Sequence, residues 1–197
     1  MTKFQLTDFV IAAGLFLFMA WLPFVAMANR VANLGSGGGA WEQIVGLGDT
    51  TNGITGSLTT NVRRAVNFTA ANSGTVTSVE LRWRSVGAIT GLTFDLQLRA
   101  AGASPGAVLT NGSIQIDGSA IPSVYGQDEY FYSTGPTLTA STEYWFEVHS
   151  DQVDASNHVQ WRYGSTGTAN MMTSTETESW SSVDTSMTMY LVINGTP

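Results

Sequence analysis

TVTSVELRWRSV, residues 75–86, alternates apolar and polar side chains along most of its length. Val79, Leu81 and Trp83 fall on one side of an extended chain, and the charged residues between them fall on the other. Successive side chains of a β-strand point to opposite faces of a sheet. The stretch therefore predicts a strand with one face in a core and one face in water.

GLTFDLQLRA, residues 91–100, repeats this alternation. Its predicted inward residues are Leu92, Phe94, Leu96 and Leu98, and its outward residues are Thr93, Asp95, Gln97 and Arg99. If the two stretches pair, their outward charges form a cross-strand ladder worth a few tenths of a kcal/mol per opposite pair.

Six further short segments show strand patterns, bounded by Gly, Asn, Asp, Ser and Pro: residues 61–70, 107–116, 127–133, 142–150, 158–164 and 186–194. Turns are predicted at Asn72-Ser73-Gly74, Pro105-Gly106, Asn111-Gly112 and Gly135-Pro136. No long helical period occurs after residue 50. The sequence thus predicts an all-β, jelly-roll-like sandwich of about eight antiparallel strands over residues 57–197.

A different pattern precedes this domain. Residues 9–28, FVIAAGLFLFMAWLPFVAMA, form an uncharged run of twenty residues. A helix of that length covers about 30 Å, the thickness of a bilayer's hydrocarbon core. We therefore predict one N-terminal transmembrane helix within residues 1–30, with membrane lipid as a partner. Its anchoring side chains are Phe9, Leu15, Phe16, Trp21 and Phe24.

A cleaved signal peptide is the alternative for this segment. Ala26-Met27-Ala28 fits the small-x-small cleavage rule, and Pro23 lies shortly before it. The run is longer than an ordinary signal core of roughly 7 to 15 residues, and Asp8 opposes Lys3 in the preceding segment, so we favour an uncleaved anchor. Lys3 and Arg30 nearly cancel in the positive-inside rule. The large acidic domain favours a periplasmic or extracellular location for the C-terminal part.

Residues 31–56 are predicted to be a glycine-rich hinge and a connecting segment. NLGSGGGA, residues 33–40, offers glycines that favour neither a helix nor packing. A small apolar cluster follows, with Trp41, Ile44, Val45 and Leu47. It could dock on the domain or lie at the lipid headgroups.

The charge of the chain argues against a nucleic-acid partner. The protein carries a net charge of −7 at pH 7. Beyond Arg30 there are six arginines and no lysine against fourteen acidic residues, a net charge of −8. Such a surface repels a phosphate backbone. The absence of cysteine excludes a disulfide framework and a thiolate metal site.

No reaction signature is evident, and we expect the protein not to be an enzyme. His149 and His158, with Asp151 and Asp154 between them, could bind a divalent cation, but a polar loop between two strands explains them more simply. No cofactor is predicted. A structural calcium ion at the oxygen-rich loops 49–52 and 151–157 lacks a recognised ligand spacing. Carboxylate pairs such as Asp128-Glu129, or Glu143 with Glu147, are interpreted as solvated strand edges.

Carbohydrate binding would need aromatic rings with polar groups beside them. The alternation of residues 142–150 places Trp145 on the face of Glu143, Glu147 and His149. A partly exposed aromatic surface is therefore predicted for sugars or a neighbouring subunit, with four candidate ligand-binding residues: Trp145, Tyr130, Tyr132 and Trp161. Packing at a sheet edge or a subunit contact is the competing interpretation.

Four phrases carry a family resemblance: NFTAANSGTVTSVEL, SPGAVL, LTASTEYWFEV and DASNHVQWRYG. Their order from about residue 58 to 193 resembles the bacterial extracellular domains called choice-of-anchor R, which are jelly-roll-like modules attached to surfaces by varied anchors. The resemblance implies a non-catalytic surface module and transfers no site residue. An N-terminal anchor departs from the family pattern.

Two functions follow from these observations. The first is a single-pass, membrane-anchored structural or accessory subunit of a larger assembly, such as a membrane complex, a virion or a surface filament, with other protein subunits as partners. The small residues Ala12, Ala13, Gly14 and Ala20 would allow close helix packing in it. The alternative is a membrane-tethered, lectin-like module that binds a glycan.

Overall fold

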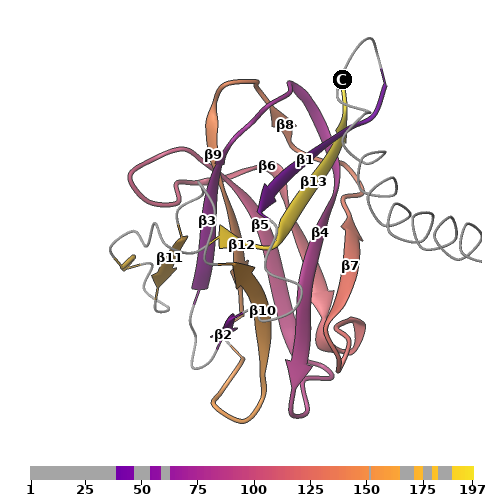
Figure 1. The fold of residues 1–197 in the computed structure, drawn as a ribbon, viewed down its shortest axis with the longest axis vertical. Coiled ribbons are helices and arrows are strands. Elements are labelled where there is room, and N and C mark those ends of the chain that lie inside the picture. Colours follow the sequence, from indigo (N-terminus) through magenta and orange to yellow (C-terminus); the bar gives the residue numbers. More distant parts are fainter. Residues whose placement is uncertain are drawn as a thin grey trace, which may run out of the picture. The chain divides into compact units, whose positions relative to one another are not determined.

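Two antiparallel β-sheets form a sandwich in this computed structural model (Figure 1). The structure describes residues 39–46, 54–58, 63–150, 152–164, 171–174, 179–181 and 188–197, with the backbone alone for residues 54–58, 163–164 and 188. All these residues belong to one unit, Gly38–Pro197. Among them the fold is all-β, apart from one short 3-10 helix, η1 (Gly118–Ala120).

The larger sheet has eight strands. Its main path runs β1-β13-β4-β10-β12, while β2 pairs with β10, and β7 and β8 pair with β4. The bounds are β1 (Trp41–Gly46), β2 (Ile54–Leu58), β4 (Gly74–Val86), β7 (Gly126–Phe131), β8 (Thr137–Leu138), β10 (His158–Gly164), β12 (Thr188–Met189) and β13 (Leu191–Thr196). The long strand β4 organises this sheet, because four other strands pair with it.

The smaller sheet has five strands in the order β11-β3-β9-β5-β6. Their bounds are β3 (Arg63–Thr69), β5 (Thr93–Ala100), β6 (Val108–Asp117), β9 (Glu143–His149) and β11 (Met171–Ser174). Strand β9 lies at the centre, so its residues have neighbours on both sides.

The main hydrophobic core lies between the two sheets. The predicted inward residues of the two opening stretches are fully buried in it, apart from the partly buried Leu92: Val79, Leu81, Trp83, Phe94, Leu96 and Leu98. The rings of Trp83 and Phe94 meet edge to face across the sandwich, with centroids 6.2 Å apart. The sequence alternation thus predicted the core faces of these strands correctly.

All eight predicted segments contain strands, but the first two do not pair with each other. Strand β4 pairs with β7, β8, β10 and β13, whereas β5 pairs with β6 and β9 in the other sheet. The chain crosses from one sheet to the other between them. Their apolar faces therefore oppose each other across the core, and the charges on their polar faces point away from each other.

Strands β1 and β2 lie within residues 31–56, the predicted hinge and connecting segment, or overlap its end. Trp41 is buried in the core, and a Cβ atom at Gly195 would collide with its ring. The Gln43 side chain donates to the Thr69 carbonyl at 2.6 Å and accepts from the Ala71 N–H at 2.9 Å. These contacts join β1 of the larger sheet to the end of β3 in the smaller one.

Asn111-Gly112 does not form the predicted turn. Both residues lie within β6, where the pairing with β5 shifts register between Gln97 and Arg99. Asn111 has a φ of 60°, and a Cβ atom at Gly112 would approach the Leu98 carbonyl oxygen to 2.7 Å. A positive φ followed by glycine therefore produces a β-bulge here.

The predicted transmembrane helix, its anchoring residues Phe9, Leu15, Phe16, Trp21 and Phe24, and the hinge up to residue 38 lie outside the described residues. Within the part of the chain that the structure describes, no helix has the length and apolar character needed to cross a bilayer.

Candidate functional site

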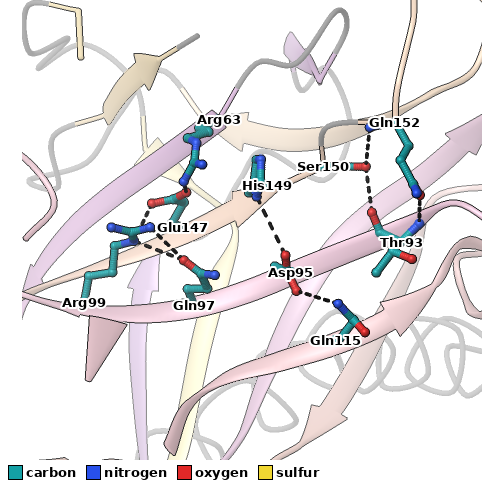
Figure 2. Close-up of polar contacts among 10 residues, drawn as sticks. All are labelled: Arg63, Thr93, Asp95, Gln97, Arg99, Gln115, Glu147, His149, Ser150 and Gln152. Atoms are coloured by element: carbon teal, nitrogen blue, oxygen red, sulfur yellow. Dashed lines mark hydrogen bonds and ion pairs between the residues drawn. The ribbon is translucent and has the colours of Figure 1, made fainter. Parts of the chain in front are cut away.

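The outer face of the five-stranded sheet carries a polar network that includes the candidate residues Glu147 and His149 (Figure 2). Its side chains come from alternate positions of β3, β5 and β9, opposite the core-facing positions of the same strands. Gln97 pairs with Glu147, and Asp95 pairs with His149, in the β5–β9 register. The pairing brings residues distant in sequence onto one surface.

Glu147 is the centre of this network and is completely buried. One carboxylate oxygen, Oε1, accepts a hydrogen bond from Arg63 Nη1 at 3.0 Å, and Oε2 lies 2.6 Å from Arg99 Nε. Arg63 and Arg99 approach from the two strands that flank β9, as Figure 2 shows. The site is therefore a buried carboxylate held between two guanidinium groups.

Arg99 has further partners that fix its position. Gln97 Oε1 accepts from Arg99 Nε at 3.1 Å and from Nη2 at 2.9 Å. Arg99 Nη1 donates to the Gly106 carbonyl at 2.9 Å, and this bond ties the loop after β5 to the sheet. The Arg99 guanidinium group is thus held by contacts with Gln97, the Gly106 carbonyl and Glu147.

Burial raises the pKa of the Glu147 carboxyl, while the charges of Arg99 and Arg63 oppose the rise. A raised pKa alone would suit a general acid. The carboxyl group, however, has no exposed surface through which to contact a substrate. The arrangement supports a structural ion cluster that joins three strands, in which Oε1 accepts a hydrogen bond and Oε2 has an ion-pair contact with Arg99 but no hydrogen bond.

His149 and Asp95 form a second, more accessible contact on the same face. His149 Nδ1 lies 3.7 Å from Asp95 Oδ2, and Gln115 Nε2 donates to Asp95 Oδ1 at 3.3 Å. The neighbouring His149 side chain is the main cause that lowers the pKa of Asp95. The two side chains keep 14% and 27% of their surface exposed. Solvent can therefore reach this contact, in contrast to the buried Glu147 carboxylate.

Neutral side chains that follow the end of β9 form the last contacts of the network. Ser150 donates through its hydroxyl to the Thr93 carbonyl at 2.6 Å, and Gln152 Oε1 accepts from the Thr93 N–H at 2.5 Å. The Ser150 hydroxyl is thus directed at a carbonyl of β5 and not at His149. This geometry does not assemble a serine nucleophile with a histidine base.

The predicted metal ligands do not converge among the described residues. His149 lies at the end of β9 in the smaller sheet, and His158 begins β10 in the larger one. Asp154 Oδ1 accepts from the N–H groups of Ser156 and Asn157 at 2.6 and 2.7 Å, which orders the loop before β10. No group of three potential metal ligands occurs in the described part of the chain. Asp151 and the loop at 49–52 lie outside it.

Trp145 lies on the predicted face of β9, but its side chain is not partly exposed as predicted. It lies on the polar face, yet only 1% of its surface is exposed, because Ala65, Met172 and Trp180 pack against it. Its indole N–H donates to the Gly102 carbonyl at 3.2 Å. The expectation of a partly exposed ring is therefore wrong. A small second core covers this part of the outer face.

The other three predicted aromatic residues are also buried, at 9% exposure or less. Tyr130 accepts through its hydroxyl from Trp83 Nε1 at 3.0 Å, and Trp161 donates to the Tyr190 carbonyl at 2.8 Å. Burial raises the pKa of Tyr130 and of Tyr132. A ring that stacks on a sugar must present a face to solvent. The role of these residues in ligand binding stays a prediction, and these contacts do not favour it.

The carboxylate pairs separate in the fold. Asp128 and Glu129 point to opposite sides of β7, because they are neighbours in one strand. Glu147 is not at a solvated edge but in a central strand, whereas Glu143 at the start of β9 is exposed. Sequence reasoning missed Arg63 as a partner of Glu147. The two residues are 84 positions apart, and only the β3–β9 pairing brings them together.

Comparisons with known proteins add little. No protein-family profile matches the sequence, and no curated protein matches it. A solved structure of infectious bursal disease virus, Gx strain, aligns with 82% of this chain at 10% sequence identity and a TM-score of 0.22. The chain spans 38% of the length of that viral chain. A TM-score this low carries no argument about fold or function.

Proposed function

We propose that this protein is a non-catalytic, membrane-anchored structural or accessory subunit of a larger assembly, which it contacts through its β-sandwich. The observation that carries the proposal is the placement of the exposed apolar side chains. Among the described residues, the large hydrophobic side chains that are exposed are Ile44, Val108, Val124 and Phe131. Ile44, Val108 and Phe131 lie on edge strands, and Val124 lies two residues before β7.

An edge strand offers unpaired N–H and C=O groups, and soluble proteins usually protect such edges with charges, prolines or a covering segment. Here Phe131 ends β7 with 67% of its surface exposed, and Val124 precedes the same strand with 71% exposed. Strand β7 pairs with β4 alone among the described strands. Exposed apolar side chains at the two ends of this edge, with the exposed polar Gln127 and Glu129 between them, suit contact with another protein subunit.

The remaining parts of the proposal rest on the sequence. The apolar run at residues 9–28 supports a single-pass anchor in membrane lipid, and the acidic domain supports a periplasmic or extracellular position, or one on the outer face of a membrane-associated particle. The phrases that resemble choice-of-anchor R domains support a jelly-roll-like surface module. Nucleic acid is not among the proposed partners, because the net charge is negative.

The test is the oligomeric state of the native protein in a mild non-ionic detergent. We expect a complex larger than one chain, by light scattering and by chemical cross-linking, and a shift toward the monomer in Phe131→Asp. Ser156→Asp is the matched control, because it adds the same charge at an exposed polar position in the loop before β10, which carries none of the four exposed apolar side chains. A free monomer in the native preparation would contradict an assembly function.

A membrane-tethered, lectin-like module is the alternative that the sequence suggested. No contact of Trp145, Tyr130, Tyr132 or Trp161 favours it, since all four rings lie in the cores. A glycan array probed with the full chain tests it directly. Binding that survives Trp145→Ala would assign any sugar site to other residues.

A further inference from the structure

We propose that the edge of strand β7 that faces away from β4 binds an extended segment of a partner subunit as an added strand, and that this segment carries two consecutive basic residues between apolar ones. This inference rests on the proposed assembly function and gives the chemistry of the partner at that contact.

The backbone of β7 offers hydrogen-bonding groups at this edge. Among the described strands, β7 pairs with β4 alone. The N–H of Tyr132, directly after β7, donates to the Thr77 carbonyl of β4 at 2.9 Å. Residues of an antiparallel strand direct their backbone groups alternately toward one side and the other. Those of Gln127, Glu129 and Phe131 therefore point away from β4, where a further strand can pair with them.

Asp128 lies on the core-facing side of this edge without a counter-charge. It is paired with Leu81 across the sheet and shares its face with Tyr130, and both of these residues belong to the core. Its Oδ2 atom is buried and has no hydrogen-bond partner among the described residues. Burial also raises the pKa of this carboxyl. A cationic donor beside the edge would supply both the missing hydrogen bond and the counter-charge.

Glu129 carries a second charge, on the outer face. Its carboxylate accepts from the Ser78 hydroxyl and the Asn194 amide, which are neutral, and it is paired directly with Glu80. Like charges directly opposite each other in a sheet are destabilising. Neither glutamate forms an ion pair within the described part of the chain. A basic side chain on an added strand would offset this repulsion.

A second copy of this chain does not fit the edge. Pairing β7 with β7 would bring the acidic side chains of two copies together on both faces, and natural proteins use inward-pointing charges to prevent such self-pairing. The same charges favour a strand of opposite sign, because repulsion excludes wrong partners while attraction selects the right one.

The pleat of a strand sets the order of residues in the partner's segment. Successive side chains point to opposite faces, so two consecutive basic residues would meet Asp128 and Glu129 together. Apolar residues at the two ends would cover Val124 and Phe131, which are 71% and 67% exposed. The six residues of β7 set the length of the paired segment.

The test is an NMR titration of the full chain, isotope-labelled and held in a non-ionic detergent, with the capped peptide Val-Thr-Lys-Arg-Thr-Val. We expect slower amide hydrogen exchange at Gln127, Glu129 and Phe131, because their N–H groups become paired with the peptide. The amides of Asp128 and Tyr130 face β4 and should change little. Two control peptides should leave all these rates unchanged: Val-Thr-Glu-Asp-Thr-Val reverses the charges, and Val-Pro-Lys-Arg-Pro-Val keeps them but loses backbone donors.

Two variants test the charges. Glu129→Lys should weaken binding of the basic peptide about tenfold, because attraction becomes repulsion, and Asp128→Asn should weaken it about two- to fivefold, as expected for one cross-strand charge pair. Glu143→Lys is the matched control, because it reverses a charge at an exposed strand position of the other sheet. Its affinity for the peptide should equal that of the native protein. Circular dichroism establishes that each variant is folded.

The proposal is overturned if the basic peptide does not slow exchange at the three outward amides, or if the proline-containing peptide binds equally well. Protection of these amides in a dimer of the chain alone would also overturn it, in favour of a second copy. With a negative titration, a native complex larger than one chain would reject this edge but keep the assembly function, whereas a native monomer would contradict that function as well.

Discussion

The two outer faces of the sandwich arise from the same alternating pattern, yet they differ in how deeply their charged side chains are buried and in which partners those side chains contact. On the five-stranded sheet, Glu147 is buried between Arg63 and Arg99, and a small apolar core covers the neighbouring Trp145. On the eight-stranded sheet, Arg84 is half-buried beside Tyr125, and the acids bond to neutral partners. Polar alternation therefore marks which side of a strand faces away from the core. It does not determine whether that side faces water.

The strongest test of this comparison is the loss of the buried carboxylate. Glu147→Gln leaves two arginines without their counter-charge, so we expect a loss of about 3–5 kcal/mol in the free energy of unfolding. Glu80→Gln, on the exposed face, should cost less than about 1 kcal/mol. Urea unfolding of the full chain in detergent, followed by tryptophan fluorescence, measures both. Equal effects would mean that the two faces do not differ.

Aromatic truncation provides the next test. Trp145→Ala removes a ring packed between Ala65, Met172 and Trp180, and we expect a loss of about 3 kcal/mol in unfolding free energy. Phe131→Ala removes a ring that is 67% exposed and should change stability by no more than about 0.5 kcal/mol. The same unfolding experiment compares them. A small effect of Trp145→Ala would show that the second core contributes little to the stability of the five-stranded sheet.

The smallest expected effect is a contrast in pH dependence between two aspartates. His149 lowers the pKa of Asp95, so its ionised form stabilises the fold above about pH 4, and this contribution is lost as pH falls through the lowered pKa. Burial raises the pKa of Asp128, so its ionised form opposes folding, and the opposition disappears as pH falls.

Asp95→Asn should therefore be slightly less stable than the native protein at pH 7, by less than about 1 kcal/mol, with the difference vanishing near pH 3. Asp128→Asn should be as stable or more stable at pH 7, and its advantage should also vanish on acidification. Thermal unfolding across pH 3–7 measures both trends. Parallel pH profiles of the two variants would contradict the opposite environments of these carboxyl groups.

The candidate site was only partly predictable from sequence. Asp95, Gln97 and Arg99 were correctly placed on one polar face, because alternation within a single strand is local information. The contact between Arg63 and Glu147 could not be predicted, since those residues meet through the pairing of β3 with β9. The burial of Trp145 was missed for a similar reason. The residues that cover it come from β3, β11 and the short segment at Trp180.

The strand at Trp41–Gly46 shows a further limit. Glycines precede it in the sequence, and its apolar residues do not alternate cleanly, so its sequence indicates a connecting segment. It becomes a strand because β13 offers a free edge and because Gly195 leaves space for the Trp41 ring. That partner lies at the other end of the described chain.

The sequence by itself determined the all-β class, the positions of eight strands and the residues that face the core, because side-chain direction in a strand repeats every two residues. The tertiary structure decided which strands are neighbours, where the sheets divide, and which polar side chains are buried. Those properties depend on contacts between residues distant in sequence. Such contacts made Glu147 the centre of an ion cluster, and they brought Arg84 and Arg162 onto one aromatic ring.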